Sequence, residues 1–190
     1  MILIRHGESE WNAAYRVHKK DPEIRDAPLT EEGRRQATRA AQELNGHDLD
    51  RILSSPLTRA LQTADFIAKA HRLPVIVEPL VCEQFFYSCD VGTPRSMLSE
   101  QWPHIDFAHL AEEWWHPEKE SEEAVIRRAN EFRDAMARTA NWRRVVVVSH
   151  WAFIRALSGQ DANNAELVRF DPTSPPPTLG GSLGWPASGA

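Results

Sequence analysis

The chain has 190 residues, of which 42% are hydrophobic and 26% are charged, and its formal net charge at pH 7 is −5. This length fits one globular domain with a substantial core. The acidic average provides no global basic field for nucleic acid or an acidic membrane, so an anion site must come from a local cluster of positive groups. No secretion signal and no run of ~18 apolar residues is found, and we expect a cytoplasmic protein.

The two cysteines, Cys82 and Cys89, form neither a disulfide framework nor a zinc-binding pattern. Two free thiols in a reducing compartment are the simplest interpretation. The sequence also lacks an obvious carboxylate cluster for magnesium, so we expect no metal and no cofactor.

In the first half of the chain, short apolar runs alternate with amphipathic segments. Residues 1–4 are apolar and stop at Arg5, which predicts a buried strand ending in a loop. Thr30 is a capping residue before an alanine-rich segment, and it predicts the start of a helix. The segments that follow are a strand over 51–54, a helix over 58–70 with apolar residues at helical spacing, and a strand over 75–77.

The second half contains the clearest strand. Residues 84–118 mix aromatics and prolines, and they are predicted to form an insertion over one end of the sheet and over the active site. A helix is predicted over 120–140, followed by the four valines of 145–148, which are apolar at every position and therefore predict a strand buried on both faces. The Pro/Gly/Ser-rich tail 172–190 is expected to be disordered or loosely draped, leaving 1–171 as a single domain.

Strands that alternate with helices predict an α/β fold, a three-layer sandwich with a mostly parallel central sheet and helices on both faces. Ligand sites in such sheets lie at the carboxyl ends of the strands. His6 and His150 each come directly after a predicted strand. The pattern alone therefore predicts that these two histidines share one crevice.

The residues around His6 suit phosphoryl transfer. A histidine nucleophile must be neutral at the nitrogen that faces phosphorus, while a hydrogen bond at its other nitrogen fixes the tautomer. Gly7 has no side chain, so the backbone can come close to the histidine and the phosphate. Its N–H is expected to reach either the second ring nitrogen of His6 or the phosphate. Arg5 offers a planar fork of donors for two phosphate oxygens. A polar strand end that faces water remains an alternative for this short motif.

Two further positions repeat or support this arrangement. Ser149-His150 follows the valine strand, and a second histidine beside the phosphate would donate a hydrogen bond; a simple strand-to-helix turn is the alternative. Arg59 lies in the first turn of a predicted helix, whose N-terminus already favours anions. An exposed surface arginine is the alternative for Arg59 alone.

Together these motifs resemble the histidine phosphatase superfamily, which includes the cofactor-dependent phosphoglycerate mutases. The resemblance rests on RHGESEWN at 5–12, SSPLTRALQTA at 54–64, VVVVSHWAF at 145–153 and the supporting PLTEEGRRQA at 28–37. It implies that His6 is the phosphorylated nucleophile, that Arg5, Arg59 and His150 bind the transferring phosphate, and that Asn12 contacts it.

The resemblance also implies a carboxylic acid that protonates the leaving oxygen. Glu83 fits this role best, and Glu78 lies closer to the preceding strand. Glu83 needs a raised pKa to hold its proton at neutral pH, and burial beside Phe85 and Phe86 would raise it. A surface glutamate in a loop is the alternative.

Departures from the mutase pattern favour hydrolysis. Ala13-Ala14-Tyr15-Arg16-Val17-His18 replaces the segment that follows this motif in the mutases, the chain is short, and Trp151 stands where many members have a small residue. We therefore expect a metal-independent phosphomonoesterase that acts on a small phosphorylated metabolite. A mutase and a non-catalytic phosphate-binding module are the alternatives.

The partner is expected to be a small-molecule phosphate ester rather than nucleic acid or a membrane, and the protein a monomer or homodimer. Seven aromatic side chains are expected around the crevice, either selecting a ring-bearing leaving group or packing the insertion onto the body. They are Trp11, Tyr15, Phe86, Tyr87, Trp102, Trp114 and Trp115.

Overall fold

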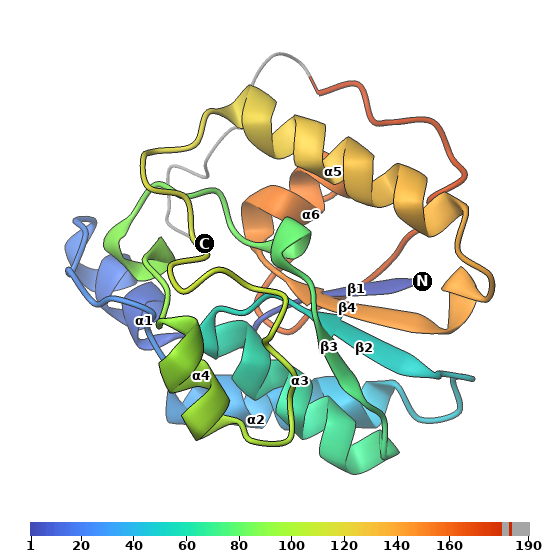
Figure 1. Ribbon diagram of the computed structural model, residues 1–190, viewed down its shortest axis with the longest axis horizontal. Helices are drawn as coiled ribbons and strands as arrows, with labels where there is room; N and C mark the ends of the chain where they lie inside the picture. The colour runs from blue at the N-terminus through green and yellow to red at the C-terminus, as the bar shows by residue number, and fades with distance from the viewer. Residues whose placement is uncertain (180–182, 184–190) are drawn as a thin grey trace.

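A computed structural model describes residues 1–179 and 183, and it places a five-stranded sheet between two layers of helices (Figure 1). The strands are β1 (Ile2–Arg5), β2 (Arg51–Ser54), β3 (Val75–Val77), β4 (Val145–Ser149) and β5 (Leu167–Arg169). The α-helices are α1 (Glu10–His18), α2 (Glu31–Glu43), α3 (Thr58–His71), α4 (Arg95–Gln101), α5 (Glu122–Ala137) and α6 (Trp151–Ser158). The 3₁₀ turns are η1 (Pro79–Val81), η2 (Ser88–Asp90) and η3 (Trp142–Arg144).

The sheet has the strand order β3-β2-β4-β1-β5, and only the edge strand β5 runs antiparallel to its neighbour. The valine strand β4 lies in the middle, between β2 and β1, and its four valines have no exposed surface. A strand covered on both faces requires apolar side chains at every position. The predicted three-layer α/β architecture with a mostly parallel sheet is confirmed.

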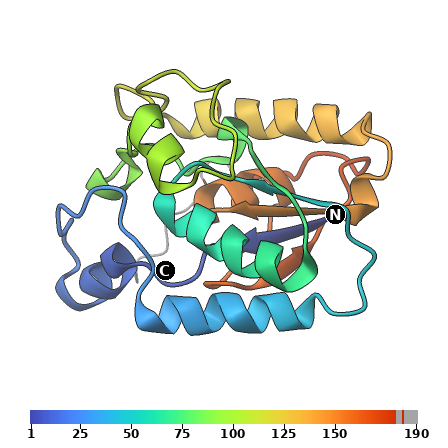
Figure 2. The ribbon, with the colours of Figure 1, turned by 60° about the horizontal axis from the view of Figure 1, so that its bottom comes forward.

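Each face of the sheet has its own core. Leu3, Val145 and Val147 point to the side covered by α5 and α6, whereas Ile4 and Val148 point to the side covered by α2 and α3. Figure 2 shows α5 and α2 on opposite sides of the strands. Because successive side chains of a strand alternate between faces, one continuous apolar run fills both cores.

Several short elements are absent from the expectations drawn from the sequence, among them α1 and β5. The helix α1 mixes Trp11 with polar residues and is held at its start by a capping box between Ser9 and Asn12. The strand β5 has only three residues and pairs antiparallel with β1 along one edge. Neither has the long hydrophobic period that makes an element recognisable in sequence.

Part of the C-terminal tail packs on the body of the protein. The Arg133 guanidinium donates to the carbonyl oxygen of Ser174 at 3.0 Å, and Leu183 has no exposed surface in the core beside α5 and α6. For these described residues the tail is fixed rather than draped. The expectation of disorder for 180–182 and 184–190 lies outside the described residues and stays a prediction.

The loop after β1 touches the first turn of α2 so closely that Gly33 tolerates no side chain. A Cβ at Gly33 would lie 2.0 Å from the backbone oxygen of Glu8. Gly33→Ala should therefore destabilise the fold by about 2 kcal/mol, although alanine is the better helix former. Thermal unfolding checks this: we expect a drop of roughly 4–8 °C, against almost no change for the exposed helix control Thr38→Ala. An unchanged midpoint for Gly33→Ala would contradict the close contact.

Candidate active site

The carboxyl ends of β1 and β4 bring the two histidines together. These strands pair in parallel with Arg5 opposite Ser149, and the backbone N–H of His6 donates to the Ser149 carbonyl oxygen at 2.9 Å. The next residues, His6 and His150, consequently place their ring centroids 5.0 Å apart. The structure thus contains the juxtaposition that the strand pattern predicts.

His6 is held in one tautomer. Its Nδ1 lies 2.7 Å from the carbonyl oxygen of Gly7, which can only accept, so Nδ1 carries the proton and Nε2 has the lone pair. Arg59 Nε donates to that Nε2 at 3.3 Å. Burial and the charges of Arg59 and Arg5 lower the pKa of His6 well below its usual value. The imidazole is therefore neutral, with Nε2 available as a nucleophile.

The glycine after His6 acts differently from the expectation. The backbone N–H of Gly7 donates to Thr63 Oγ1 at 3.1 Å rather than to an imidazole nitrogen, and its carbonyl oxygen orients the ring instead. A Cβ on Gly7 would lie 2.4 Å from the Gly33 carbonyl oxygen. Glycine is required here because α2 passes so near.

His150 is completely buried, and among the described residues neither of its ring nitrogens has a hydrogen-bond partner. Burial, followed by the charges of Arg59 and His6, lowers the pKa of His150 well below its usual value. A buried polar group without a partner costs free energy, which a ligand can recover by accepting its hydrogen bond. An oxyanion beside His6 is such a ligand.

Arg59 enters the site from the start of α3. The backbone N–H and hydroxyl of Thr58 both donate to Asp26 at 2.8 Å, and this remote carboxylate caps the helix where Leu57 offers no side-chain cap. The terminal nitrogens of Arg59 donate to the Cys89 carbonyl oxygen at 2.7 Å and to Asp90 Oδ1 at 3.0 Å. The predicted phosphate-binding arginine is buried and paired with a carboxylate.

Asp90 is a site residue that the sequence analysis missed. Its Oδ2 accepts from the backbone N–H groups of Phe86 and Tyr87 at 3.1 and 2.9 Å, which closes the η2 turn over Arg59. Isolated aspartates in loops are common and usually exposed, so no pattern in the chain distinguishes this one. The pairing means that an anion bound by Arg59 must compete with Asp90.

We expect Asp90→Asn to bind inorganic phosphate at least about tenfold more tightly than the unmodified protein, because a like charge is removed next to Arg59. Isothermal titration calorimetry with phosphate measures this affinity, and circular dichroism checks that the substitution has not unfolded the domain. Weaker or unchanged phosphate binding would show that Asp90 does not compete with the anion.

Five of the six predicted site residues line one small cavity of about 20 Å³, together with Ser9, Trp11, Tyr87, Cys89 and Asp90. They are Arg5, His6, Asn12, Arg59 and Glu83. A cavity of this size holds about one water molecule, so a phosphoryl group requires some of the lining side chains to move apart. The sixth, His150, lies behind this cavity with its ring against His6.

Arg5 and Asn12 are both fixed by backbone neighbours. Arg5 donates to the Ala162 carbonyl oxygen at 3.0 Å, and burial lowers its pKa to about 10, so it stays charged at neutral pH. Asn12 Oδ1 accepts from the backbone N–H of Ser9 at 3.1 Å and lies 3.4 Å from Asn164 Nδ2. The α1 capping box thus places Asn12 at the cavity wall.

The structure places Glu83, rather than Glu78, at the site. Glu83 Oε1 accepts from the backbone N–H groups of Gln84 at 2.9 Å and Ala152 at 3.0 Å, so a proton on this carboxyl group resides on Oε2. Burial, and then the charge of Asp90, raise the pKa of Glu83 to about 7. Glu78 instead caps η1 by accepting from Leu80 N–H at 3.0 Å, and it lines neither cavity.

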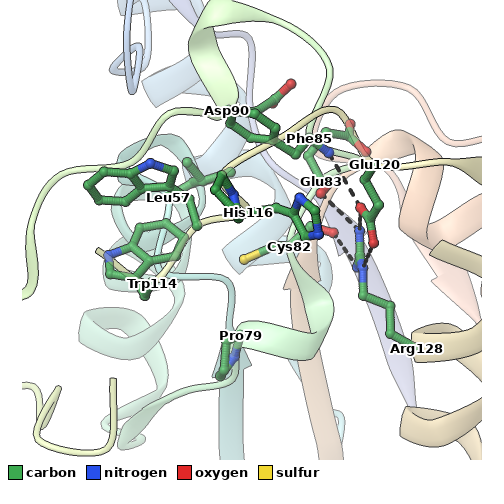
Figure 3. Close-up of a pocket in the computed structure, with 12 residues that line it drawn as sticks. Leu57, Pro79, Cys82, Glu83, Phe85, Asp90, Trp114, His116, Glu120 and Arg128 are labelled. Carbon is green, nitrogen blue, oxygen red and sulfur yellow. Dashed lines mark hydrogen bonds and ion pairs between the residues drawn. The ribbon is translucent and has the colours of Figure 1, made fainter. Parts of the chain in front are cut away.

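A second cavity of about 280 Å³ adjoins the first, since Glu83 and Asp90 belong to the walls of both. Figure 3 shows Leu57 and Trp114 on one side of it and the Glu120–Arg128 ion pair on the other. Of the seven aromatics expected at the crevice, two line this cavity. They are Trp114 and Trp115.

The other five aromatics have different surroundings. Trp11 stacks on Tyr15 at 4.6 Å between centroids and lies 4.8 Å from Tyr87, at the edge of the small cavity. Trp102 packs on the core between α3 and α4, and Phe86 is exposed beneath Lys119. Trp102 thus packs the insertion onto the body, whereas the selection of a ring-bearing leaving group by Trp114 and Trp115 stays a prediction.

The half-buried Cys82 lies in the wall of the larger cavity next to Glu83. Its Sγ accepts a hydrogen bond from Ser55 Oγ at 3.5 Å, and burial raises the pKa of this thiol to about 12.

Within residues 1–179 and 183, no group of three or more His, Cys, Asp or Glu side chains is placed to hold a metal ion. No helix in the described part of the chain is both long and apolar enough to cross a membrane.

Comparison with known families gives the same assignment as the motifs. Residues 1–174 match the model of the histidine phosphatase superfamily, branch 1. The chain belongs to this superfamily. The superfamily match spans the sheet, both histidines and the 84–118 segment.

Members of the superfamily that are named for different activities are similar to this chain. Phosphoserine phosphatase 1 of Hydrogenobacter thermophilus is 39% identical over 168 residues, covering 83% of this chain and 73% of the relative. A probable phosphoglycerate mutase, GpmB, of Photorhabdus laumondii is 43% identical over 101 residues, which is 53% of this chain but only 45% of that protein. A solved mycobacterial glucosyl-3-phosphoglycerate phosphatase with VO3 is 25% identical, with a TM-score of 0.61 and 88% of each chain covered. The histidine phosphatase fold and a phosphatase or mutase type of activity follow.

Proposed function

We propose that this protein is a phosphomonoesterase that forms a phosphohistidine on His6 Nε2. The observation that carries the proposal is the state of His6: its Nδ1 is bound to the Gly7 carbonyl oxygen, and its Nε2 lone pair faces Arg59. A neutral imidazole with one fixed tautomer is what nucleophilic attack on phosphorus requires.

The first step uses Glu83 as an acid. The His6 Nε2 lone pair attacks phosphorus, the bond from phosphorus to the ester oxygen breaks, and the Glu83 Oε2 proton passes to that oxygen, which releases the alcohol. Arg5 and Arg59 offset charge on the equatorial oxygens, and His150 donates a hydrogen bond to one of them. Each of these groups is buried, where such interactions are strong.

The second step returns the site to its starting state. The Glu83 carboxylate takes a proton from a water molecule, whose oxygen attacks phosphorus while the bond from phosphorus to His6 Nε2 breaks. Inorganic phosphate leaves, His6 is neutral again and Glu83 is protonated. These steps use residues of the chain alone, so we propose that no metal or cofactor takes part and that the partner is a small phosphate ester.

The intermediate itself is the test of this proposal. Incubation with ³²P-labelled ester in EDTA, followed by a rapid quench, should give a phosphoprotein that is stable in alkali and labile in acid, as phosphohistidine is. Some relatives are named as probable phosphoglycerate mutases. A mutase would also form the phosphohistidine, but it would isomerise a phosphoglycerate faster than it hydrolyses it. Tight phosphate binding without a labelled protein would instead indicate a binding module.

A further inference from the structure

The two cavities are neighbours, with Glu83 and Asp90 in the walls of both. An ester with phosphorus at His6 Nε2 must place its leaving oxygen toward Glu83, which is proposed to protonate it. Because Glu83 and Asp90 line both cavities, the larger cavity borders the expected position of that oxygen and can receive the carbon skeleton attached to it. The walls of the larger cavity therefore select the alcohol part of the substrate.

The aromatic wall of the larger cavity is fixed in place. Trp114 Nε1 donates to the Thr93 carbonyl oxygen at 2.9 Å, and its ring lies so close to Gly92 that a Cβ there would be 2.2 Å from it. Trp115 meets Trp114 edge-to-face, with centroids 5.6 Å apart and an interplanar angle of 84°. Two positioned indoles present a preorganised apolar surface to a flat ring.

The larger cavity offers no free cation to a carboxylate. All five N–H donors of Arg128 are used, two by Glu120, at 2.8 and 2.9 Å, and three by backbone carbonyl oxygens at 2.7–2.9 Å. No lysine is among the lining residues, and His116 is exposed at the rim with its Nδ1 2.5 Å from the Glu118 carbonyl oxygen. Asp90 and Glu120 are carboxylates, which disfavour a further anionic group in this cavity. Each is paired with an arginine, Asp90 with Arg59 and Glu120 with Arg128.

We infer that the substrate is the phosphate monoester of an uncharged alcohol bearing an aromatic ring, seated against Trp114 and Trp115. This inference rests on the proposed function and adds the substrate class. The volume of about 280 Å³ lies near the lower end of small-molecule pockets, roughly 300–1,000 Å³, which suits one ring or two fused rings. Phosphoserine and phosphoglycerates, whose leaving groups carry a carboxylate, are predicted to be poor substrates despite the names of the relatives.

Three esters of primary alcohols test the substrate class on the unmodified protein: 2-phenylethyl phosphate, ethyl phosphate and phosphoserine. Their alcohols leave with comparable difficulty, so differences in kcat/KM report mainly on the cavity. We expect kcat/KM for 2-phenylethyl phosphate to exceed the other two by at least about tenfold, the effect of burying one ring. A higher kcat/KM for phosphoserine would overturn the inference and leave the phosphatase proposal intact.

Trp115→Ala locates the preference at the aromatic wall. Trp115 lines the larger cavity and His6 the smaller one. The variant should lose about tenfold in kcat/KM for 2-phenylethyl phosphate while ethyl phosphate changes by less than about twofold. The control Trp142→Ala removes another half-buried tryptophan, from η3 beside β4, and should change neither value. Equal losses on both esters would overturn the role of this wall.

Failure of the proposed phosphatase function would give a different result from failure of the inferred substrate class. If no ester of the series yields phosphate and no acid-labile phosphoprotein forms, the chemistry itself is absent, and the substrate class falls with it. If the phosphoprotein forms from all three esters at equal rates, the phosphatase stands and the aromatic selection is overturned.

Discussion

Replacing His6 with alanine is expected to lower kcat for p-nitrophenyl phosphate by at least roughly a thousandfold, because the nucleophile is removed. No other group of the site can replace the imidazole as nucleophile. His150 is buried behind His6, and the guanidinium groups of Arg5 and Arg59 donate hydrogen bonds but have no lone pair for attack on phosphorus. Release of p-nitrophenol in EDTA between pH 5 and 8 measures the loss.

Two controls separate the loss of the nucleophile from loss of the fold. His47 is an exposed histidine outside both cavities, and His47→Ala should keep full activity. His6→Ala should still bind inorganic phosphate, since Arg5, Arg59 and His150 remain. Full hydrolysis by His6→Ala would rule out the phosphohistidine mechanism.

Glu83 is expected to set the alkaline limit of the reaction. With a pKa of about 7, the carboxyl group is protonated below that pH and loses its proton above it, so kcat/KM should fall about tenfold per pH unit above 7. Glu83→Gln should abolish this limb and lower kcat for ethyl phosphate by roughly 10²–10⁴. A kcat/KM profile from pH 5 to 9 measures both effects.

The leaving group separates acid catalysis by Glu83 from a structural role. Nitrophenolate leaves without a proton, so the first step with p-nitrophenyl phosphate should suffer much less in Glu83→Gln than the first step with ethyl phosphate. Glu78→Gln is the matched control, because that glutamate only caps η1. Equal losses of phosphoenzyme formation on both esters would remove Glu83 from the role of proton donor.

The same pKa predicts how stability depends on pH. An unfolded Glu83 ionises near 4.5 and the folded one near 7, so the unfolded chain gives up its proton first and stability falls as pH rises between these values. The rise in pKa corresponds to about 3 kcal/mol, and Glu83→Gln should lack that share of the decrease. Urea unfolding at pH 5 and pH 8 of both proteins gives the difference.

The sequence predicts the parallel part of the sheet well because its central strands, β1 and β4, are covered on both faces. The four valines of β4 and the apolar run of β1 are visible as continuous runs, and the helices α2, α3 and α5 have clear periodicity. The edge strand β5 and the helix α1 depend on tertiary contacts and capping, and their own residues do not distinguish them from loops.

The site residues also differ in how well the sequence predicts them. His6, Arg59 and His150 follow predicted strands or begin a predicted helix, so topology alone brings them to one edge. Asp90 and the sorting of the aromatics arise within residues 84–118, where long-range packing decides which side chains turn inward. The distance between a loop residue and the sheet is not encoded in any local pattern.

The backbone bond from His6 N–H to Ser149 has a consequence for local opening. This amide lies between two strands in the middle of the sheet, so its hydrogen exchanges only when the core opens, at close to the global free energy of unfolding. The η2 turn, in contrast, is held by hydrogen bonds of loop residues to Asp90 and by the bonds that Arg59 donates to Cys89 and Asp90, which a bound anion would compete for. Because the nucleophile belongs to the centre of the sheet and Asp90 to a separate turn, Asp90 can give way to an anion while His6 keeps its position.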